Sequence, residues 1–328
     1  MWALSFFTAW TIPDMWTKDN LPDVEPDGLY VPEVGEWGCD KYLRVWMYDE
    51  IFARSMKGKW TRVYLDLFAG AGYAYLKGSK RIVPSSALLA LQIPDPFDLY
   101  IFCEADPKPL AALQARVQRL NPSVPVHFVK GDANESVEAI LRLIPVQRSL
   151  TFCFVDPFGT NVRLSAIRQL ANARKMDFLI LLALGMDANR NRDRYQKEAC
   201  ERLDDFLGGR DWRKRWEEAK RSGKGFRGFL AEQYAEAMSA LGYLDTNLEE
   251  MYPYAYHIET CYCTIWRSSV STTSPKVFGL KCESTAMSRP GLASKVLPIP
   301  QPSLPASHPT YAHLIRARQP SAYGLPTV

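Results

Sequence analysis

The stretch "VYLDLFAGAGYA", residues 63 to 74, joins an apolar run to an acid and two glycines. Three strand-forming residues precede Asp66, and Phe68, Gly70 and Gly72 follow it. This order is typical of a buried strand that ends where the backbone must turn tightly or approach a ligand closely. By itself the stretch fits either a cradle for a nucleotide-like ligand or a plain strand-to-helix turn.

Similar apolar runs recur along the chain and alternate with segments of helical periodicity. The expected strands are residues 62–68, 99–106, 126–132, 150–156 and 177–184, and the expected helices between them are 85–92, 109–120, 136–144 and 164–173. Short runs rich in Val, Ile, Leu and Phe, separated by helices, predict βαβ units and a parallel sheet covered on both faces. The predicted fold is therefore a doubly wound α/β sheet with helices on both faces.

The flanking segments differ from this core in composition. Residues 1–40 have no period and are expected to form an irregular lead-in to a core at 41–186. Residues 187–256 are charged and helical, which predicts an appendage packed on the core, and 257–328 are expected to form an irregular tail. In the appendage, Trp212 and Trp216 lie four residues apart, so they favour an amphipathic helix anchored to the core over a basic surface with stacking aromatics.

The overall composition narrows the function classes. The chain has 328 residues, 47% of them hydrophobic, and a net charge of +4, which is compatible with nucleic acid without requiring it. Its seven irregularly spaced cysteines predict free thiols, and we find no zinc or calcium loop pattern and hence no metal site. No apolar run is long enough to cross a bilayer, so we expect a cytoplasmic protein without membrane contact. The oligomeric state is not specified.

Four acids stand where consecutive predicted strands end: Asp66, Glu104, Asp132 and Asp156. In open parallel sheets, ligands bind at the carboxyl ends of the strands. One such acid alone would be a helix cap or a loop carboxylate, but four in succession favour a shared site. A dinucleotide loop would need a third glycine, which makes an NAD-linked oxidoreductase a weak alternative.

An acid placed before the glycines suits a ligand that carries a cation or an amine, such as S-adenosylmethionine. We expect the methionine end of this cofactor to lie against Asp66, Phe68, Gly70 and Gly72. Glu104 would bind the ribose hydroxyls, and Asp132 with Ala133 would meet the adenine.

The stretch "VDPFGT" at the exit of the fourth strand contains the candidate catalytic residues Asp156, Pro157, Phe158 and Gly159. An acid followed by proline forms a rigid turn that projects the next side chain into the cleft. The turn is similar to that of amino-methyltransferases, in which Asp or Asn precedes two prolines and an aromatic residue, although Phe158 here comes one place early. An exocyclic amine is one acceptor that fits; the alternative is a buried turn in which Asp156 caps the next helix.

Taken together, the motifs resemble the three-Cys-motif partner proteins (TcmP). The resemblance covers roughly residues 33 to 256 and rests on "VGEWGCDKYLRVWMY" with Trp37 and Lys41, on "YLDLFAGAGY", "PSSALLAL", "GDAN" and "VDPFGT", and on "LALGMDANRNRDRY". It implies a Rossmann-like, S-adenosylmethionine-dependent methyltransferase encoded beside a radical-SAM-like three-cysteine protein. Nucleic acid, a modified peptide or a small molecule could be the acceptor. The competing implication is a non-catalytic partner that keeps the fold.

The end of the chain departs from this family. Family members tend to end with a further strand, whereas this chain continues "TCYCTIWRSSVSTTSPKVFG" and becomes rich in Ser and Pro. A reading frame shifted by two bases permits a family-like ending, so we hypothesise that the coding frame slipped near His257; the alternative is a natural disordered tail. Early stop codons in the shifted frame would exclude the slip. Loss of the last strands would leave a sheet edge unpaired and lower the solubility.

Overall fold

The computed structural model describes residues 21–184, 195, 201–244, 252–256 and 259–266. The chain divides into two compact units, 1–279 and 280–328, and every described residue lies in the first. The described elements, in chain order, are β1 (Glu33–Val34), α1 (Trp37–Met56), β2 (Thr61–Asp66), β3 (Tyr73–Leu76), β4 (Ile82–Pro84), α2 (Ser86–Ala90), β5 (Leu99–Glu104), α3 (Pro107–Leu120), β6 (Val126–Lys130), α4 (Val137–Leu143), β7 (Ser149–Val155), α5 (Leu164–Ala173), β8 (Met176–Leu182), α7 (Arg202–Leu207), α8 (Trp212–Arg221), α9 (Phe226–Ser239), β9 (Tyr252–Tyr256) and β10 (Glu259–Trp266).

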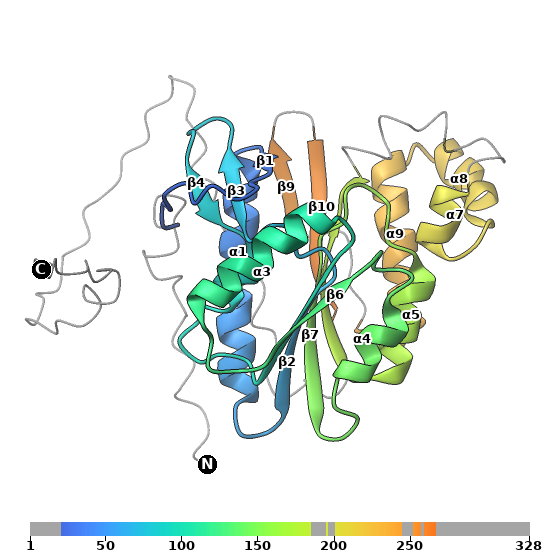
Figure 1. Cartoon of the computed structure of the whole chain (residues 1–328). Coiled ribbons are helices and arrows are strands. Elements are labelled where there is room, and N and C mark those ends of the chain that lie inside the picture. Colours follow the sequence, from blue (N-terminus) through green and yellow to red (C-terminus); the bar gives the residue numbers. More distant parts are fainter. Residues whose placement is uncertain (1–20, 185–194, 196–200, 245–251, 257–258, 267–328) are drawn as a thin grey trace, which may run out of the picture. The chain divides into compact units, whose positions relative to one another are not determined.

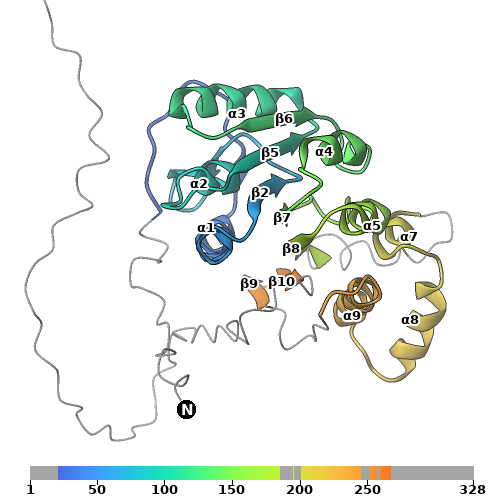
Figure 2. The ribbon, with the colours of Figure 1, turned by 90° about the horizontal axis from the view of Figure 1, so that it is seen from below.

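The main sheet has seven strands in the order β6-β5-β2-β7-β8-β10-β9 (Figure 1; all seven are labelled in Figure 2). Neighbours from β6 to β8 are parallel, whereas β10 runs antiparallel to both β8 and β9. The first strand of this sheet in chain order is β2, in its middle. Strands β5 and β6 follow on one side of β2, and β7 and β8 then follow on the other side. This is a doubly wound, Rossmann-like α/β sheet, and the five strands predicted from the apolar runs are confirmed.

Alternating side chains of the strands pack on opposite faces of the sheet. On β7, Phe152 and Phe154 belong to a buried cluster with side chains of α1, α2 and α3. Cys153 and Val155 belong to a second cluster with side chains of α4, α5, α7, α8 and α9. Viewed along the strands, α1 and α2 lie on one side of the sheet and α4, α5 and α9 on the other (Figure 2). Because both faces are covered, the inner strands β2, β5, β7 and β8 are buried along almost their whole length, whereas the edge strand β6 is partly exposed.

The expected boundary between an irregular lead-in at 1–40 and a core at 41–186 is wrong. Helix α1 begins at Trp37 and crosses this boundary, and part of the lead-in is regular, because β1 pairs with β3 in a small sheet that also contains β4. Asp27 in the lead-in binds the buried guanidinium of Arg116 on α3. A segment without periodicity is thus held by strand pairing and one buried ion pair, neither of which has a periodic signature.

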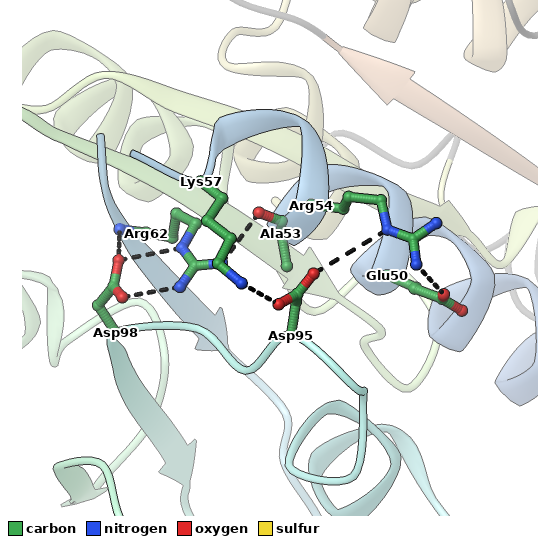
Figure 3. A network of polar contacts seen from close by, with 7 residues as sticks. All are labelled: Glu50, Ala53, Arg54, Lys57, Arg62, Asp95 and Asp98. Carbon is green, nitrogen blue, oxygen red and sulfur yellow. Dashed lines mark hydrogen bonds and ion pairs between the residues drawn. The ribbon is translucent and has the colours of Figure 1, made fainter. Parts of the chain in front are cut away.

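Helix α1 is pinned to the sheet at its C-terminal end (Figure 3). Arg62, at the start of β2, donates to the carbonyl of Ala53 (3.0 Å) and makes a bidentate pair with Asp98 through Nε and Nη2 (3.0 and 2.8 Å). Lys57 binds Asp95 in the same network. The start of β2 and the loop before β5 therefore fix where this end of α1 lies.

The expected division after residue 186 is also wrong in part. Phe229, Leu230 and Tyr234 of α9 are buried in the cluster that covers one face of the sheet, so α9 belongs to the core and not to an appendage. Trp212 and Trp216 of α8 are buried too, which confirms the amphipathic alternative for these two tryptophans. Charged residues on the outer faces of these helices gave the segment its polar composition and obscured its buried stripe.

Strands β9 and β10 correct the expectation that the chain becomes irregular at residue 257. β10 pairs with β8 from Tyr262 opposite Leu182 to Trp266 opposite Phe178, so the edge beside β8 is covered. The segment "ETCYCTIW" is rich in aromatic and β-branched residues, which favour strands, although it lacks the long aliphatic run of the earlier strands. Residues 267–328, which include most of the expected tail and of the proposed frame slip, lie outside the described residues.

Candidate functional site

The four predicted acids lie at one edge of the sheet. Asp66 is the last residue of β2 and Glu104 is the last residue of β5. Asp156 follows β7 directly, and Asp132 comes two residues after β6. These four strands are parallel, so their carboxyl ends share an edge, and β2 lies between β5 and β7 at the point where the winding reverses. Ligands of open α/β sheets bind at this point.

The glycine loop after β2 is tied to the end of β5. The amide of Gly70 donates to Oε2 of Glu104 (2.9 Å), while Oε1 of Glu104 accepts from the amide of Asp106 (2.9 Å). Gly70 and Gly72 have φ angles of 62° and 84°, in the left-handed region that favours glycine. The loop and the second acid, which are about thirty residues apart in the sequence, therefore form one structure.

Asp66 is fully buried beneath this loop. Its Oδ2 accepts from the hydroxyl of Ser86 (2.8 Å) and its Oδ1 from the amide of Phe68 (3.0 Å). Burial raises the pKa of Asp66 to about 7, although these two hydrogen bonds lower it, and the charges of Asp156 and Glu104 raise it further. Ser86 begins α2, but its hydroxyl serves Asp66 rather than capping the helix. The helix predicted at 85–92 gave no indication of this role for Ser86.

The third strand leads to a short turn. The exposed Asp132 accepts from the amide of Asn134 (2.8 Å), and Ala133 is buried. Asn134 reaches across to the loop after β7: its Nδ2 donates to the carbonyl of Asn161 (2.9 Å), and its Oδ1 accepts from the amide of Arg163 (2.7 Å). Asn134 therefore links the exits of β6 and β7. The motif "GDAN" contained it, but nothing in the sequence indicated this bridge.

The turn after β7 presents one polar and one apolar group. Pro157 is buried, Gly159 has a φ of 71°, and the side chain of Phe158 is 88% exposed. The residue that caps α5 is Arg163, so the alternative in which Asp156 caps this helix is wrong. Asp156 instead forms an ion pair with Lys41 of α1, with Nζ to Oδ2 at 2.5 Å.

Lys41 is the main site residue for which the sequence predicted no role. Its ammonium lies over the rings of Trp37 (4.8 Å to the centroid) and Tyr42 (4.7 Å). Burial opposes the charge of Lys41, but Asp156, Tyr42 and Asp66 outweigh it and raise the pKa of Lys41 above its ordinary value. The spacing of Trp37 and Lys41, four residues apart on one helix, shows that they share a face. That this face meets the exit of β7 depends on the packing of α1.

The structure brings three of the four acids into one electrostatic environment. The charges of Asp156 and Glu104 both act on Asp66, and that of Asp66 acts on Lys41. Asp132 shares one electrostatic effect with two of these acids. Burial raises the pKa of the Cys103 thiol to about 12, and the charges of Glu104, Asp66 and Asp132 raise it in the same direction. The site therefore has a buried centre at Asp66 and an exposed margin at Asp132.

Other features of the described residues lie apart from this edge. A cavity of ≈ 530 Å³ opens beside Trp60, Arg148 and Lys175, which precede β2, β7 and β8 and so lie at the opposite edge of the sheet. None of the four acids lines it. Within the described ranges, no group of three or more His, Cys, Asp or Glu side chains is placed to hold a metal ion. No helix in these ranges combines the length and apolar character that a membrane span needs.

Comparisons with known proteins give distant structural matches. No protein-family model matches the chain, and no curated protein matches it in sequence. Among solved structures, a putative O-methyltransferase from Klebsiella pneumoniae is 13% identical, with a TM-score of 0.38 over 69% of this chain and 80% of the other. Trm5b from Pyrococcus abyssi is 11% identical, with a TM-score of 0.35 over 73% of this chain and 50% of the other. A precorrin-6y C5,15-methyltransferase from Geobacter metallireducens is 11% identical, with a TM-score of 0.35 over 68% and 87%.

Proposed function

We propose that this protein is an S-adenosylmethionine-dependent methyltransferase. The observation that carries the proposal is the junction of the glycine loop with the second acid, Gly70 to Glu104, directly above the buried Asp66. The strand order supports it, because β2 lies between β5 and β7 and places this junction at the winding reversal. Bound S-adenosylmethionine would supply an electrophilic methyl group on a sulfonium.

The residues at the edge fit such a donor. A Cβ added at Gly70 would meet nothing within 4 Å, so the outer side of the loop is open for close approach of a ligand. Asp66 provides a carboxylate for an amine, and Glu104 keeps free lone pairs beside its two backbone hydrogen bonds for a pair of hydroxyls. We assign the adenine to Asp132 and Ala133, which follow β6, the strand next to β5. Methyl transfer requires mainly alignment and a polar anchor from the protein.

The turn after β7 is the proposed acceptor site. Asp156 would accept a hydrogen bond from the acceptor, and the exposed ring of Phe158 would lie against a flat group. An amine of a nucleic acid fits both features. We further propose that the protein works with a radical-SAM-like three-cysteine protein, as the resemblance to the TcmP family implies.

A second candidate is a non-catalytic partner protein that keeps the fold. One observation favours it: both oxygens of Glu104 already accept backbone hydrogen bonds, and Asp156 is already paired with Lys41. A site whose polar groups already have hydrogen-bond or ion-pair partners within the protein gains less binding free energy from a ligand than a site whose polar groups lack partners. Turnover, rather than binding, separates the two candidates.

The test measures donor binding first and turnover second. S-adenosylmethionine at 100 times its Kd should stabilise the protein by about 2.7 kcal/mol and raise its melting temperature accordingly. Asp66→Asn should abolish this shift, whereas Asp211→Asn, at an exposed position on the start of α8, should keep it. No shift with the wild-type protein would refute the cofactor assignment. Release of S-adenosylhomocysteine with RNA, DNA or cell extract would identify an enzyme, and binding without release would favour the partner role.

A further inference from the structure

The ammonium of Lys41 sits in a cage built from two elements that are far apart in the sequence. One wall is the carboxylate of Asp156, 2.5 Å away, and the others are the rings of Trp37 and Tyr42. A carboxylate with two aromatic faces is a recognised combination for holding a cation. In this protein the cage is filled by the chain's own side chain.

The charges in this cage balance. The side chain of Lys41 is 5% exposed and that of Asp156 is 21% exposed, so neither charge is well hydrated. A buried ammonium persists only when it is paired, and Asp156 is the hydrogen-bond partner that the described residues provide. The pair leaves Asp156 ionised but electrically compensated. Its Oδ2 is committed to Lys41, and its Oδ1 has no hydrogen-bond partner among the described residues.

The position of Lys41 is imposed by the whole of helix α1. One end of the helix is anchored by Arg62, which holds the carbonyl of Ala53, and by the neighbouring network of Lys57 and Asp95 (Figure 3). Its middle packs on the sheet through buried side chains such as Tyr48 and Phe52, which contact Phe152 of β7. Lys41 is therefore not a mobile surface lysine but a charge held at a set place beside the turn after β7.

We propose that Lys41 is a positioning residue of the acceptor site, which holds Asp156 by one oxygen and leaves the other to a neutral N–H donor. This inference rests on the proposed methyltransferase function. A protonated alkylamine is a poor acceptor, because its nitrogen has no lone pair and its charge would lie beside the ammonium of Lys41, where the charge of Asp156 is already compensated. A planar, uncharged amine on an aromatic ring meets both requirements, since it donates to Oδ1 of Asp156 and lies flat against the exposed Phe158.

The first experiment tests the cage without any knowledge of the acceptor. Lys41→Ala should open a space lined by Asp156, Trp37 and Tyr42, and propylammonium chloride should refill it. We expect propylammonium to raise the melting temperature of Lys41→Ala by several degrees above a sodium chloride control. It should leave the wild type and the double variant Lys41→Ala/Asp156→Asn unchanged. An equal shift in the wild type, or no shift in Lys41→Ala, would overturn the proposal.

A mirror variant covers the case in which Lys41→Ala does not fold. Asp156→Ala leaves the ammonium of Lys41 without its carboxylate, and sodium formate should restore a partner. Formate should therefore stabilise Asp156→Ala more than the wild type, and equal effects on both proteins would contradict the pairing.

The second experiment tests the acceptor class with tritiated S-adenosylmethionine. We expect methyl incorporation into total RNA but not into polylysine, and incorporation into polylysine would overturn the inference. Lys41→Met should bind S-adenosylmethionine within about threefold of the wild type but lose at least tenfold in transfer to RNA. Equal losses in binding and transfer would show a merely structural role. Donor binding without transfer to either polymer would overturn the proposed acceptor class while the cofactor assignment stands, and the ammonium and formate results would still decide whether Lys41 pairs with Asp156.

Discussion

Replacing Arg116 should destabilise the protein more than removing any single surface ion pair would. The guanidinium is 2% exposed and uses four hydrogen bonds: Nε and Nη2 donate to Asp27 (2.8 and 2.7 Å), and Nη1 donates to the carbonyls of Tyr30 (3.0 Å) and Ala71 (2.6 Å). It also lies over the ring of Tyr73, 4.2 Å from the centroid. Arg116 thus joins the lead-in, α3 and the glycine loop.

The expected magnitude follows from what Arg116→Met leaves behind. Removing one partner of a buried ion pair costs about 3–5 kcal/mol, because the remaining charge stays buried without compensation. Asp27 is 14% exposed, so water relieves part of this penalty, but two carbonyls also lose their donor. We expect a loss of about 4 kcal/mol in the free energy of unfolding. Arg116→Lys should still lose about half of this, since an ammonium cannot reproduce a planar four-bond arrangement.

Urea unfolding followed by circular dichroism measures this loss. The matched control is Arg142→Met, which removes an exposed pair with Glu138 one helical turn away on α4 and should cost less than about 0.5 kcal/mol. The Arg116 guanidinium lowers the pKa of Asp27, so the pair contributes above the unfolded-state pKa near 3.8 and its contribution is lost as the pH falls through the folded-state pKa. The difference between Arg116→Met and wild type should therefore shrink below pH 4. A loss under about 1 kcal/mol at pH 7 would refute the reasoning.

Three further substitutions test the site. Asp66→Asn should be up to about 4 kcal/mol more stable than wild type at pH 8. A folded-state pKa of about 7 makes the Asp66 carboxylate of the wild type increasingly costly as the pH rises from 4 to 7. A wild-type protein with the same stability to urea at pH 5 and at pH 8 would contradict this. Gly72→Ala should lower the free energy of unfolding by about 2–4 kcal/mol in thermal unfolding, because its Cβ would approach Leu88 and Leu113 to 3.0 Å and its φ is positive. The control Gly58→Ala, with a positive φ but open space around the Cβ, should lower it by only about 1 kcal/mol. Phe158→Ala should change the stability by less than about 0.5 kcal/mol and leave S-adenosylmethionine binding intact while it weakens RNA binding; a large loss of stability would show that the ring is structural.

The sheet could be predicted from the sequence because strand burial is a local signal. Five apolar runs with helical segments between them can satisfy their hydrophobic faces in few ways other than a doubly wound parallel sheet. Acids that end such runs necessarily share one edge, so Asp66, Glu104 and Asp156 could be grouped before any contact was known. The segment "ETCYCTIW" escaped prediction because an antiparallel strand without a long aliphatic run gives a weaker pattern.

Tertiary packing decided the partners of these acids. Nothing in the sequence pattern singled out Ser86 or Asn134, yet Ser86 binds Asp66 and Asn134 joins the exits of β6 and β7. Lys41 lies more than a hundred residues from Asp156, and a pairing across that separation has no periodicity and no spacing to read. The sequence by itself determined the sheet and the edge at which the acids gather. Only the docking of α1 against the sheet decided that one of them is paired with a buried lysine, because charge pairs are set by three-dimensional distance and not by order along the chain.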